Sequence, residues 1–303
     1  MISEIRCIFS ENCILGESPF WHPKEKVLYW VDILGKKLHR LDVKNNHHQF
    51  WLMPTDISCM APNEEGGIIA GFKNGVALLN PISNKINYLD TLSEKASAES
   101  VFNDGHCDRQ GRFWLGSKAA FEVGAKDILA LAPTGEVYRF GADKKLIKQA
   151  GDFIVTNGLV FSLDSKYFFI ANSPKRIIYR YEFDSETGTI HNPIEFIKVA
   201  DDAGVPDGMA FDSEGYLWNC HFNGWRITRY TPDGKIDRVI KTPVGYPTSC
   251  CFGGPDLKTL FITSAKRDVS DAELKNQPLA GALFAIDVAI PGVAEPCFRG
   301  VRI

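Results

Sequence analysis

The stretch VPDGMAFDSEGYLWNC, residues 205–220, places an Asp-Gly pair directly ahead of an apolar run. The turn sequence Asp-Ser-Glu-Gly follows, and then a second apolar run that contains Trp218. Two β-rich runs joined by a short turn of Asp and Gly are typical of a β-hairpin. Asp207-Gly208 could itself be a tight turn, since both residue types favour chain reversals. The rest of the chain decides whether Asp207 has another role.

The same pattern occurs six times along the chain. Its copies are residues 17–32, 58–72, 103–117, 157–173, 205–220 and 248–264. Equivalent strand residues are about 40 to 55 positions apart, which is the range expected of propeller blades. Each copy continues into further short strands, so the sequence predicts an all-β fold, a six-bladed β-propeller that spans residues 1–303 as a single domain. A pair of β-sandwich sheets with an accidental period is the competing fold.

Several local features complete this prediction. Short helical turns are expected only at residues 92–100 and 271–278. Strands near residues 3–9 and 295–302 are expected to pair and to close the last blade. Four aromatic residues recur once per blade and are expected to fill the core between blades. They are Trp30, Trp114, Phe168 and Trp218.

Composition argues against several classes of protein. The net charge is −3 and Lys and Arg are scattered, so nucleic acid is not expected as a partner. Charged residues interrupt the N-terminus where a signal peptide would be apolar, and no run approaches the ~20 apolar residues of a membrane helix. The eight cysteines show no metal-ligand spacing. We therefore expect a cytoplasmic protein with reduced thiols and no membrane partner, either a monomer or a small homo-oligomer.

Ungapped alignment of the copies brings six polar residues to one position. They are Glu17, Ser58, Asn103, Asn157, Asp207 and Thr248. In a propeller the first strand of each blade runs along the central channel, so these residues should meet at one mouth of it. Two buried carboxylates are costly without compensation, and no Lys or Arg occupies the position. Oxygen ligands favour hard cations such as Ca²⁺, Mg²⁺ or Mn²⁺, so we predict one metal ion at this mouth. Solvation by water in the channel is the alternative.

Five motifs resemble the senescence-marker-protein/gluconolactonase family of regucalcin-like sugar lactonases. They are LGESPFW (15–21), FNDGHCDRQGRFWLG (102–116), TNGLVFSLD (156–164), PDGMAFDSEGYLW (206–218) and CFGGPDLKTLFIT (251–263). The resemblance implies a six-bladed propeller that hydrolyses sugar lactones with one divalent metal ion. By motif, the metal ligands of the family fall on Glu17, Asn157 and Asp207. An Asn that touches the substrate falls on Asn103.

Two departures from the family pattern leave the identity of the sugar open. Lactonases of the family often carry Arg two positions before the substrate Asn, and Val101 stands there. They also often place a Glu after the next strand, where the nearest candidate is Glu122. Lys118 could supply a replacement charge, although a solvated loop lysine is an equally good interpretation. Lys118 and Glu122 are therefore candidate substrate-binding residues.

The expected chemistry is hydrolysis of a cyclic ester. A divalent ion (Ca²⁺, Mg²⁺, Mn²⁺, Zn²⁺ or Fe²⁺) can polarise the lactone carbonyl and make a water nucleophilic. Asp207 is the predicted catalytic base for that water. Glu17 would balance charge as a ligand, Asn157 would be a neutral ligand, and Asn103 would orient the substrate.

The sequence also allows other interpretations. The same propeller could hydrolyse an organophosphate or an aryl ester, or could bind calcium without catalysis. His47-His48 could bind metal, but a solvated hairpin turn is the favoured interpretation. His106 and His221 are expected to be hydrogen-bonded strand residues.

Overall fold

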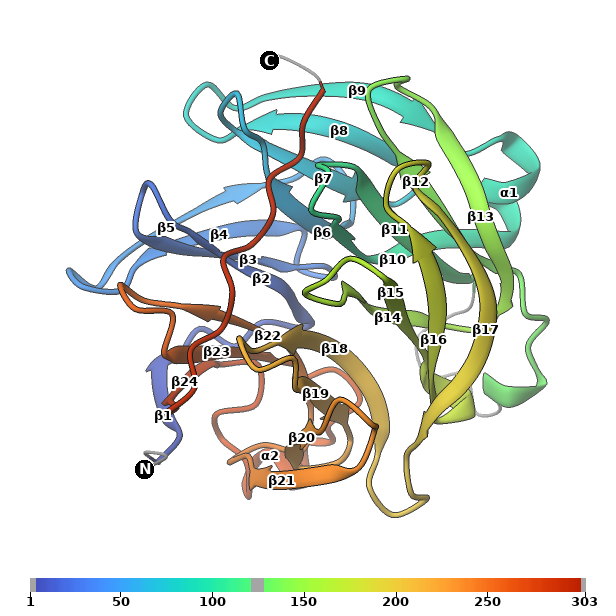
Figure 1. Ribbon diagram of the computed structural model, residues 1–303. Helices are drawn as coiled ribbons and strands as arrows, with labels where there is room; N and C mark the ends of the chain where they lie inside the picture. The colour runs from blue at the N-terminus through green and yellow to red at the C-terminus, as the bar shows by residue number, and fades with distance from the viewer. Residues whose placement is uncertain (1–3, 121–127, 301–303) are drawn as a thin grey trace. The chain divides into compact units, whose positions relative to one another are not determined.

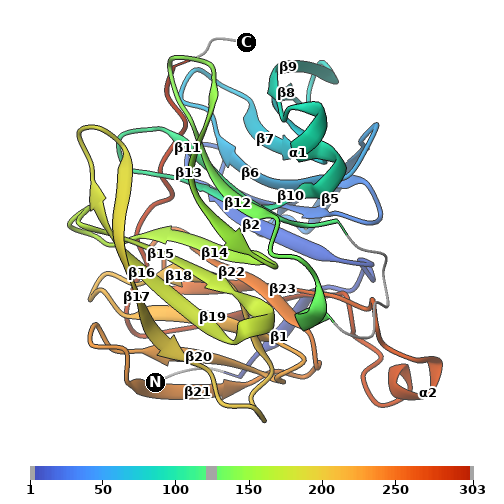
Figure 2. The same ribbon diagram turned by 90° about the vertical axis from the view of Figure 1, so that its right-hand side faces the viewer.

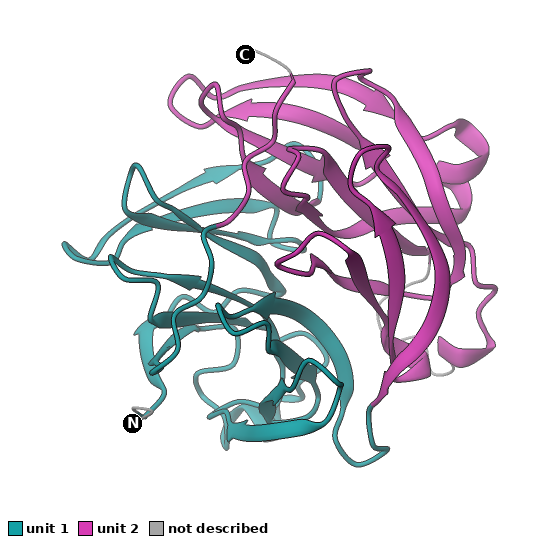
Figure 3. Cartoon of the chain, viewed as in Figure 1, with its two compact units in different colours: residues 1–56, 199–294 teal, residues 57–198, 295–303 magenta. Residues whose placement is uncertain are grey.

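The computed structural model describes residues 4–120 and 128–300 (Figure 1). The chain divides into two compact units, which Figure 3 distinguishes by colour. Unit 1 comprises residues 1–56 and 199–294, and unit 2 comprises residues 57–198 and 295–303. Each unit contains three antiparallel sheets of four strands within the described residues. The prediction of six four-stranded blades is therefore confirmed.

The sheets of unit 1 are built from consecutive hairpins. The first contains β2 (Gly16–His22), β3 (Val27–Asp32), β4 (Lys37–Asp42) and β5 (His47–Leu52). The second contains β18 (Val205–Phe211), β19 (Leu217–Phe222), β20 (Arg226–Tyr230) and β21 (Ile236–Lys241). The third contains β22 (Pro247–Gly253), β23 (Thr259–Ser264), β24 (Leu283–Asp287) and β1 (Arg6–Phe9). The short helix α2 (Asp271–Leu274) follows β23 along the chain.

Unit 2 repeats this plan. Its first sheet contains β6 (Ile57–Pro62), β7 (Ile68–Phe72), β8 (Gly75–Asn80) and β9 (Lys85–Thr91). The second contains β10 (Ser100–Cys107), β11 (Phe113–Ala119), β12 (Gly135–Phe140) and β13 (Leu146–Phe153). The third contains β14 (Thr156–Phe161), β15 (Tyr167–Asn172), β16 (Ile177–Asp184) and β17 (Thr189–Lys198). Helix α1 (Glu94–Glu99) leads into β10 (Figure 2), and 3₁₀ turns occupy Ile128–Ala130 and Ser173–Lys175.

Both expected helical turns are present, as α1 and α2, but the two terminal segments do not pair with each other as predicted. β1 pairs with β24 and completes its sheet. The segment expected at residues 295–302 does not join it, because Phe298 forms a parallel bridge with Asn63 in unit 2. The Phe298 ring is fully buried and lies 5.8 Å from that of Phe140. Burial of such a ring contributes about 1.5–3 kcal/mol, which explains why this segment follows the unit 2 core.

An Asp at the start of a turn fixes the following strand in both units. Asp108 Oδ1 accepts hydrogen bonds from the backbone N–H groups two and four residues later, at 3.0 and 2.9 Å. Its Oδ2 accepts one from the indole of Trp114 at 3.0 Å. Asp212 repeats the arrangement in unit 1, with 3.0 and 3.1 Å to the backbone and 2.9 Å to Trp218. The D-x-x-G-x-x-W pattern therefore sets both the turn and the inward position of the tryptophan.

The cores lie between neighbouring sheets of each unit. All four recurring aromatic residues are fully buried in apolar clusters, as expected. Trp114 packs at 5.4 Å from Phe168 in unit 2, and Trp218 at 5.9 Å from Phe252 in unit 1. Among the described residues, none of the helices has the length and apolar character needed to cross a membrane.

Candidate metal and substrate site

The six aligned polar residues occupy equivalent places in the six sheets. In every sheet, the pairing of the first strand with its neighbour shifts register at this position. The shifts fall at Glu17–Phe20, Ile57–Cys59, Phe102–Asp104, Asn157–Val160, Pro206–Met209 and Pro247–Cys250. A bulge of this kind bends the strand and redirects a side chain, and it is common beside active sites.

The two units differ in the charge of the residues that they contribute to these six. Unit 1 holds Glu17, Asp207 and Thr248, and unit 2 holds Ser58, Asn103 and Asn157. Both carboxylates therefore lie in unit 1, and both carboxamides lie in unit 2.

The carboxylates of unit 1 are buried and act on a common neighbour. Glu17 is 8% exposed and Asp207 is 4% exposed. Burial raises the pKa of the Cys220 thiol well above its ordinary value, and its contact with Cys250 and the negative charges of Asp207 and Glu17 raise this pKa further. Both carboxylates therefore act on the same buried thiol.

Close backbone packing positions Asp207. A Cβ atom on the next residue, Gly208, would lie 2.6 Å from the Ser249 backbone, so only glycine fits between β18 and β22. The hydroxyl of Thr248 donates a hydrogen bond to the carbonyl of Gly16 at 2.5 Å and thereby ties β22 to β2 beside Glu17. Thr248 therefore supports the position of Glu17.

The carboxamides of unit 2 are hydrogen-bonded to each other. Asn103 Nδ2 donates to Asn157 Oδ1 at 2.7 Å and to the carbonyl of Thr156 at 2.9 Å. Asn157 Nδ2 donates to Ser173 Oγ at 2.9 Å. These contacts orient the Asn157 oxygen toward Asn103. An amide oxygen has two lone pairs, so it can accept this bond and still bind a cation.

Sequence reasoning missed Asp104, a buried carboxylate that follows Asn103 and binds the backbone directly after Asn157. Its Oδ2 accepts a hydrogen bond from Gly158 N at 2.6 Å and its Oδ1 accepts one from Gly105 N at 2.8 Å. Burial raises the pKa of Asp104, and the two backbone hydrogen bonds oppose that rise. The available signal was the second Asp-Gly pair of the repeats, Asp104-Gly105, directly after Asn103.

The structure places one of the two candidate substrate contacts. Lys118 on β11 is half-buried and stands directly opposite Val101 on β10. Residues paired in this way project from the same face of the sheet, so the Lys118 side chain starts beside Val101. Glu122 lies outside the described residues.

The histidines differ from one another. His221 Nδ1 lies 2.9 Å from the carbonyl of Ala203, and His106 Nε2 lies 3.1 Å from Glu295, as expected of strand histidines with partners. The interpretation of His48 as part of a solvated turn was wrong. It belongs to β5, where strand alternation turns its ring inward while that of His47 stays exposed.

A family model and individual relatives both match most of the chain. Residues 15–266 match the family model described as the SMP-30/gluconolactonase/LRE-like region. The chain is 36% identical to 6-deoxy-6-sulfogluconolactonase of Pseudomonas putida over 302 residues, 99% of this chain and 100% of that protein. It is 32% identical to regucalcin of Xenopus laevis over 299 residues, 98% of this chain and 99% of that protein.

The structure also resembles that of a calcium-binding protein, regucalcin, from Agrobacterium tumefaciens. The TM-score is 0.89 at 23% identity, over 97% of each chain. With six four-stranded sheets in the described residues, this likeness identifies the fold as a six-bladed β-propeller. The chain belongs to the SMP-30/gluconolactonase/LRE-like family.

Proposed function

We propose that the protein hydrolyses a sugar lactone to the corresponding aldonic acid. The observation that carries the proposal is the buried carboxylate pair of unit 1, Glu17 and Asp207, at equivalent strand bulges. Family membership and the full-length likeness to a protein named as a sulfogluconolactonase favour a lactone over an aryl ester or organophosphate.

We further propose that the reaction depends on one divalent metal ion. Two carboxylates form a hard, anionic donor set, which suits Ca²⁺, Mg²⁺ or Mn²⁺. Asn157 of unit 2 is the third ligand that the sequence motif predicts, and the name of a structural relative as a calcium-binding protein supports such an ion. When bound, the ion would polarise the lactone carbonyl and lower the pKa of a water.

Each side chain then has a defined task. Asp207 accepts a proton from the water while the oxygen of the water attacks the carbonyl carbon of the lactone. The ring C–O bond breaks, and the ring oxygen takes up the proton that Asp207 accepted and becomes a hydroxyl. Glu17 supplies negative charge that balances the cation, and Asn103 positions the substrate while its hydrogen bond orients Asn157.

The far end of the substrate faces a residue pair that differs from the family pattern. Val101 replaces the expected Arg, and Lys118 stands opposite it. An ammonium group there can pair with an anionic substituent, as a point charge rather than as a fork. The Pseudomonas relative is named for a lactone that carries a sulfonate. We therefore propose an aldonolactone with an anionic or strongly polar distal substituent.

A proton-release assay on a panel of lactones, with and without EDTA, tests this function. The panel contains gluconolactone, galactonolactone, 6-deoxy-6-sulfogluconolactone, an aryl ester and an organophosphate. We expect EDTA-sensitive turnover of lactones, fastest for the sulfonated one. Turnover confined to aryl or phosphoryl esters, or calcium binding without any turnover, would contradict the proposal.

A further inference from the structure

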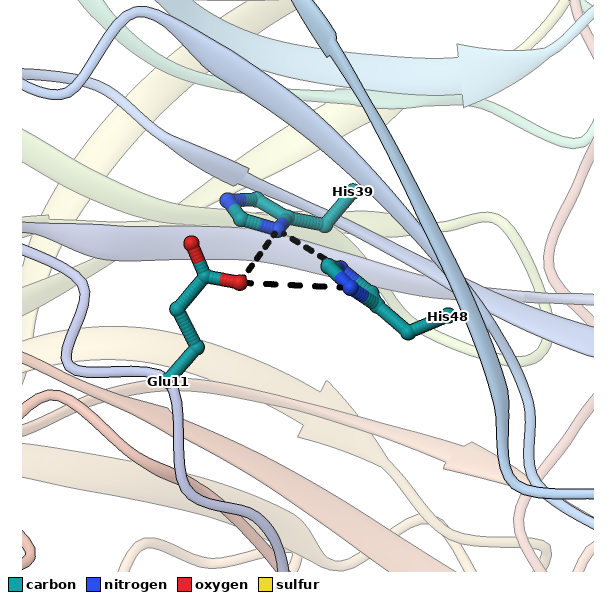
Figure 4. A group of neighbouring side chains, drawn as sticks. All are labelled: Glu11, His39 and His48. Carbon is teal, nitrogen blue, oxygen red and sulfur yellow. Dashed lines mark hydrogen bonds and ion pairs between the residues drawn. The ribbon is translucent and has the colours of Figure 1, made fainter.

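Unit 1 contains a second group of potential metal ligands, in addition to Glu17 and Asp207. It consists of three side chains that lie close together (Figure 4). Glu11 lies between β1 and β2, His39 lies on β4, and His48 lies on β5. His39 Nδ1 is 3.0 Å from His48 Nε2. Glu11 Oε2 is 4.0 Å from His39 Nδ1 and 3.9 Å from His48 Nδ1. We refer to these three residues as the Glu-His-His cluster.

Aromatic packing holds the two imidazole rings. His39 stacks on Trp30 at 4.8 Å between ring centroids, and His48 packs against Phe9 at 4.2 Å. The side chain of His39 is 0% exposed, that of His48 is 15% exposed and that of Glu11 is 30% exposed. The cluster is therefore rigid on the histidine side and open to solvent at the carboxylate, which gives an ion a route of entry.

The polar contacts of His39 concentrate on the cluster. Within residues 4–120 and 128–300, its buried Nε2 has no hydrogen-bond partner, so Nδ1 is the nitrogen that meets polar groups. Burying an imidazole is costly when only one nitrogen is satisfied. The Nδ1 atom of this fully buried histidine therefore faces another histidine and a carboxylate, as the ligand atoms of a metal site do.

The protonation states also suit metal binding. Burial lowers the pKa of His39 to about 4, and burial likewise lowers the pKa of His48. Burial alone would raise the pKa of Glu11, but the Lys37 hydrogen bond at 2.7 Å and the positive charge of Lys37 lower it. At neutral pH the cluster therefore offers neutral imidazoles and an ionised carboxylate, the forms in which these groups bind metals.

We propose that the Glu-His-His cluster binds a divalent transition-metal ion of the Zn²⁺ class. One ligand atom from each residue lies within 4.8 Å of the others. A tetrahedral Zn²⁺ with bonds of about 2.0–2.1 Å separates its ligands by roughly 3.4 Å, so small side-chain rotations suffice. Imidazole nitrogen favours Zn²⁺, Cu²⁺ and Ni²⁺, whereas the Glu17–Asp207 pair favours hard cations. The two sites should thus select different ions.

The bound ion would fasten the start of the chain to its first sheet. Glu11 follows β1, which belongs to the β22–β24 sheet, while both histidines belong to the β2–β5 sheet. An ion held by all three residues therefore links two sheets of unit 1 and should raise its resistance to heat.

Zn²⁺ titration in excess Mg²⁺ tests the proposal. The protein is stripped with EDTA, dialysed into millimolar Mg²⁺ to supply the carboxylate pair with a hard cation, and titrated with Zn²⁺ by equilibrium dialysis. His48→Gln removes a ligand, and His47→Gln is its matched control, because it removes the adjacent but exposed imidazole. We expect wild type and His47→Gln to bind one equivalent of Zn²⁺ that His48→Gln binds at least tenfold more weakly. Zn²⁺ should also raise the melting temperature of the first two proteins more than that of the third.

Equal Zn²⁺ stoichiometry, affinity and thermal shift in all three proteins would overturn the proposal. If His48→Gln does not fold, Glu11→Gln carries the same test from a more exposed position. The readouts are binding and melting rather than turnover, so the result does not depend on the lactonase proposal.

Discussion

Unit 1 and unit 2 each carry three of the six polar residues at the strand bulges, and the two sets differ in charge. Unit 1 contributes the carboxylates Glu17 and Asp207, and unit 2 contributes the amides Asn103 and Asn157. The backbone has the same feature in both units, because the first strand of each sheet shifts register at this position. The repeat therefore sets where a side chain is presented, and the residue type sets what it can do.

The contacts beneath these residues show a second difference. In unit 1, Gly208 packs against the Ser249 backbone, and its lack of a side chain allows the approach. In unit 2, the equivalent glycine, Gly158, donates a hydrogen bond to the buried carboxylate of Asp104. Beneath the aligned position, unit 1 thus relies on close backbone packing, whereas unit 2 relies on a buried carboxylate.

The largest expected effect follows from the charge difference between the units. Asp207→Asn keeps one oxygen donor but cannot accept a proton, so kcat should fall about 10²–10⁴-fold while metal binding falls much less. Stopped-flow proton release at saturating lactone, with bound metal measured on the same sample, checks both quantities.

Ser58→Ala is the control in unit 2. It removes an uncharged hydroxyl from the same position, where Ser58 donates to the Gly71 carbonyl, so kcat should change only a few-fold. Near-native kcat in metal-loaded Asp207→Asn would mean that the base is another residue. The difference in charge between the aligned residues of unit 1 and unit 2 would then have no role in catalysis.

The second prediction concerns specificity in unit 2. Val101→Arg restores the fork that the family often carries, beside Lys118. It should change the ratio of kcat/KM between lactones by one to two powers of ten, since a charged bidentate pair is worth roughly 1.5–3 kcal/mol. Parallel changes across the lactone panel would show that position 101 does not contact the substrate. Lys118→Met is the companion variant, expected to lower kcat/KM for the sulfonated lactone more than for gluconolactone.

Sequence alone predicts the blades well, because each blade repeats a local pattern. Asp108 and Asp212 form their turns with neighbours only two to six residues away, so the D-x-x-G-x-x-W motif contains its own explanation. The same locality explains why the aligned polar residues fall at equivalent bulges. The resemblance to the family likewise reached the correct fold and the correct family.

Contacts between distant segments are what the sequence could not predict. Phe298 pairs with Asn63, and His39 meets Glu11, through packing that no periodicity records. The partner of Asp104, Gly158, is 54 residues away. None of these three contacts could be predicted, because a short motif does not show which buried group a distant segment will place beside it.

The third prediction concerns the buried carboxylate of Asp104 in unit 2. Asp104→Asn replaces one acceptor with an amide donor, which leaves the N–H of Gly158 or Gly105 without its bond. An unsatisfied buried donor costs roughly 1–3 kcal/mol of unfolding free energy. Urea unfolding should show this loss, and kcat/KM should also fall because Asn103 and Asn157 lose their support. Asp164→Asn, in an exposed turn of the same unit, is the control and should leave both values nearly unchanged. Unchanged stability in Asp104→Asn would show that the unit 2 amides do not need this carboxylate.

The smallest expected effect concerns acid sensitivity in unit 1. Burial lowers the pKa of His221 to about 4, whereas an unfolded histidine has a pKa of about 6.5. Below about pH 6.5 this histidine binds a proton in the unfolded chain but stays neutral in the folded chain. The free energy of unfolding therefore falls as the pH drops toward 4. The slope is at most about 1.4 kcal/mol per pH unit for one histidine. His221→Asn retains an amide near the position of Nδ1, so the urea midpoint should fall less between pH 7.5 and pH 5.0 than in wild type, with EDTA present in all samples. His191→Asn replaces an exposed imidazole in unit 2 and should behave like wild type. An equal fall in all three proteins would place the acid sensitivity outside His221.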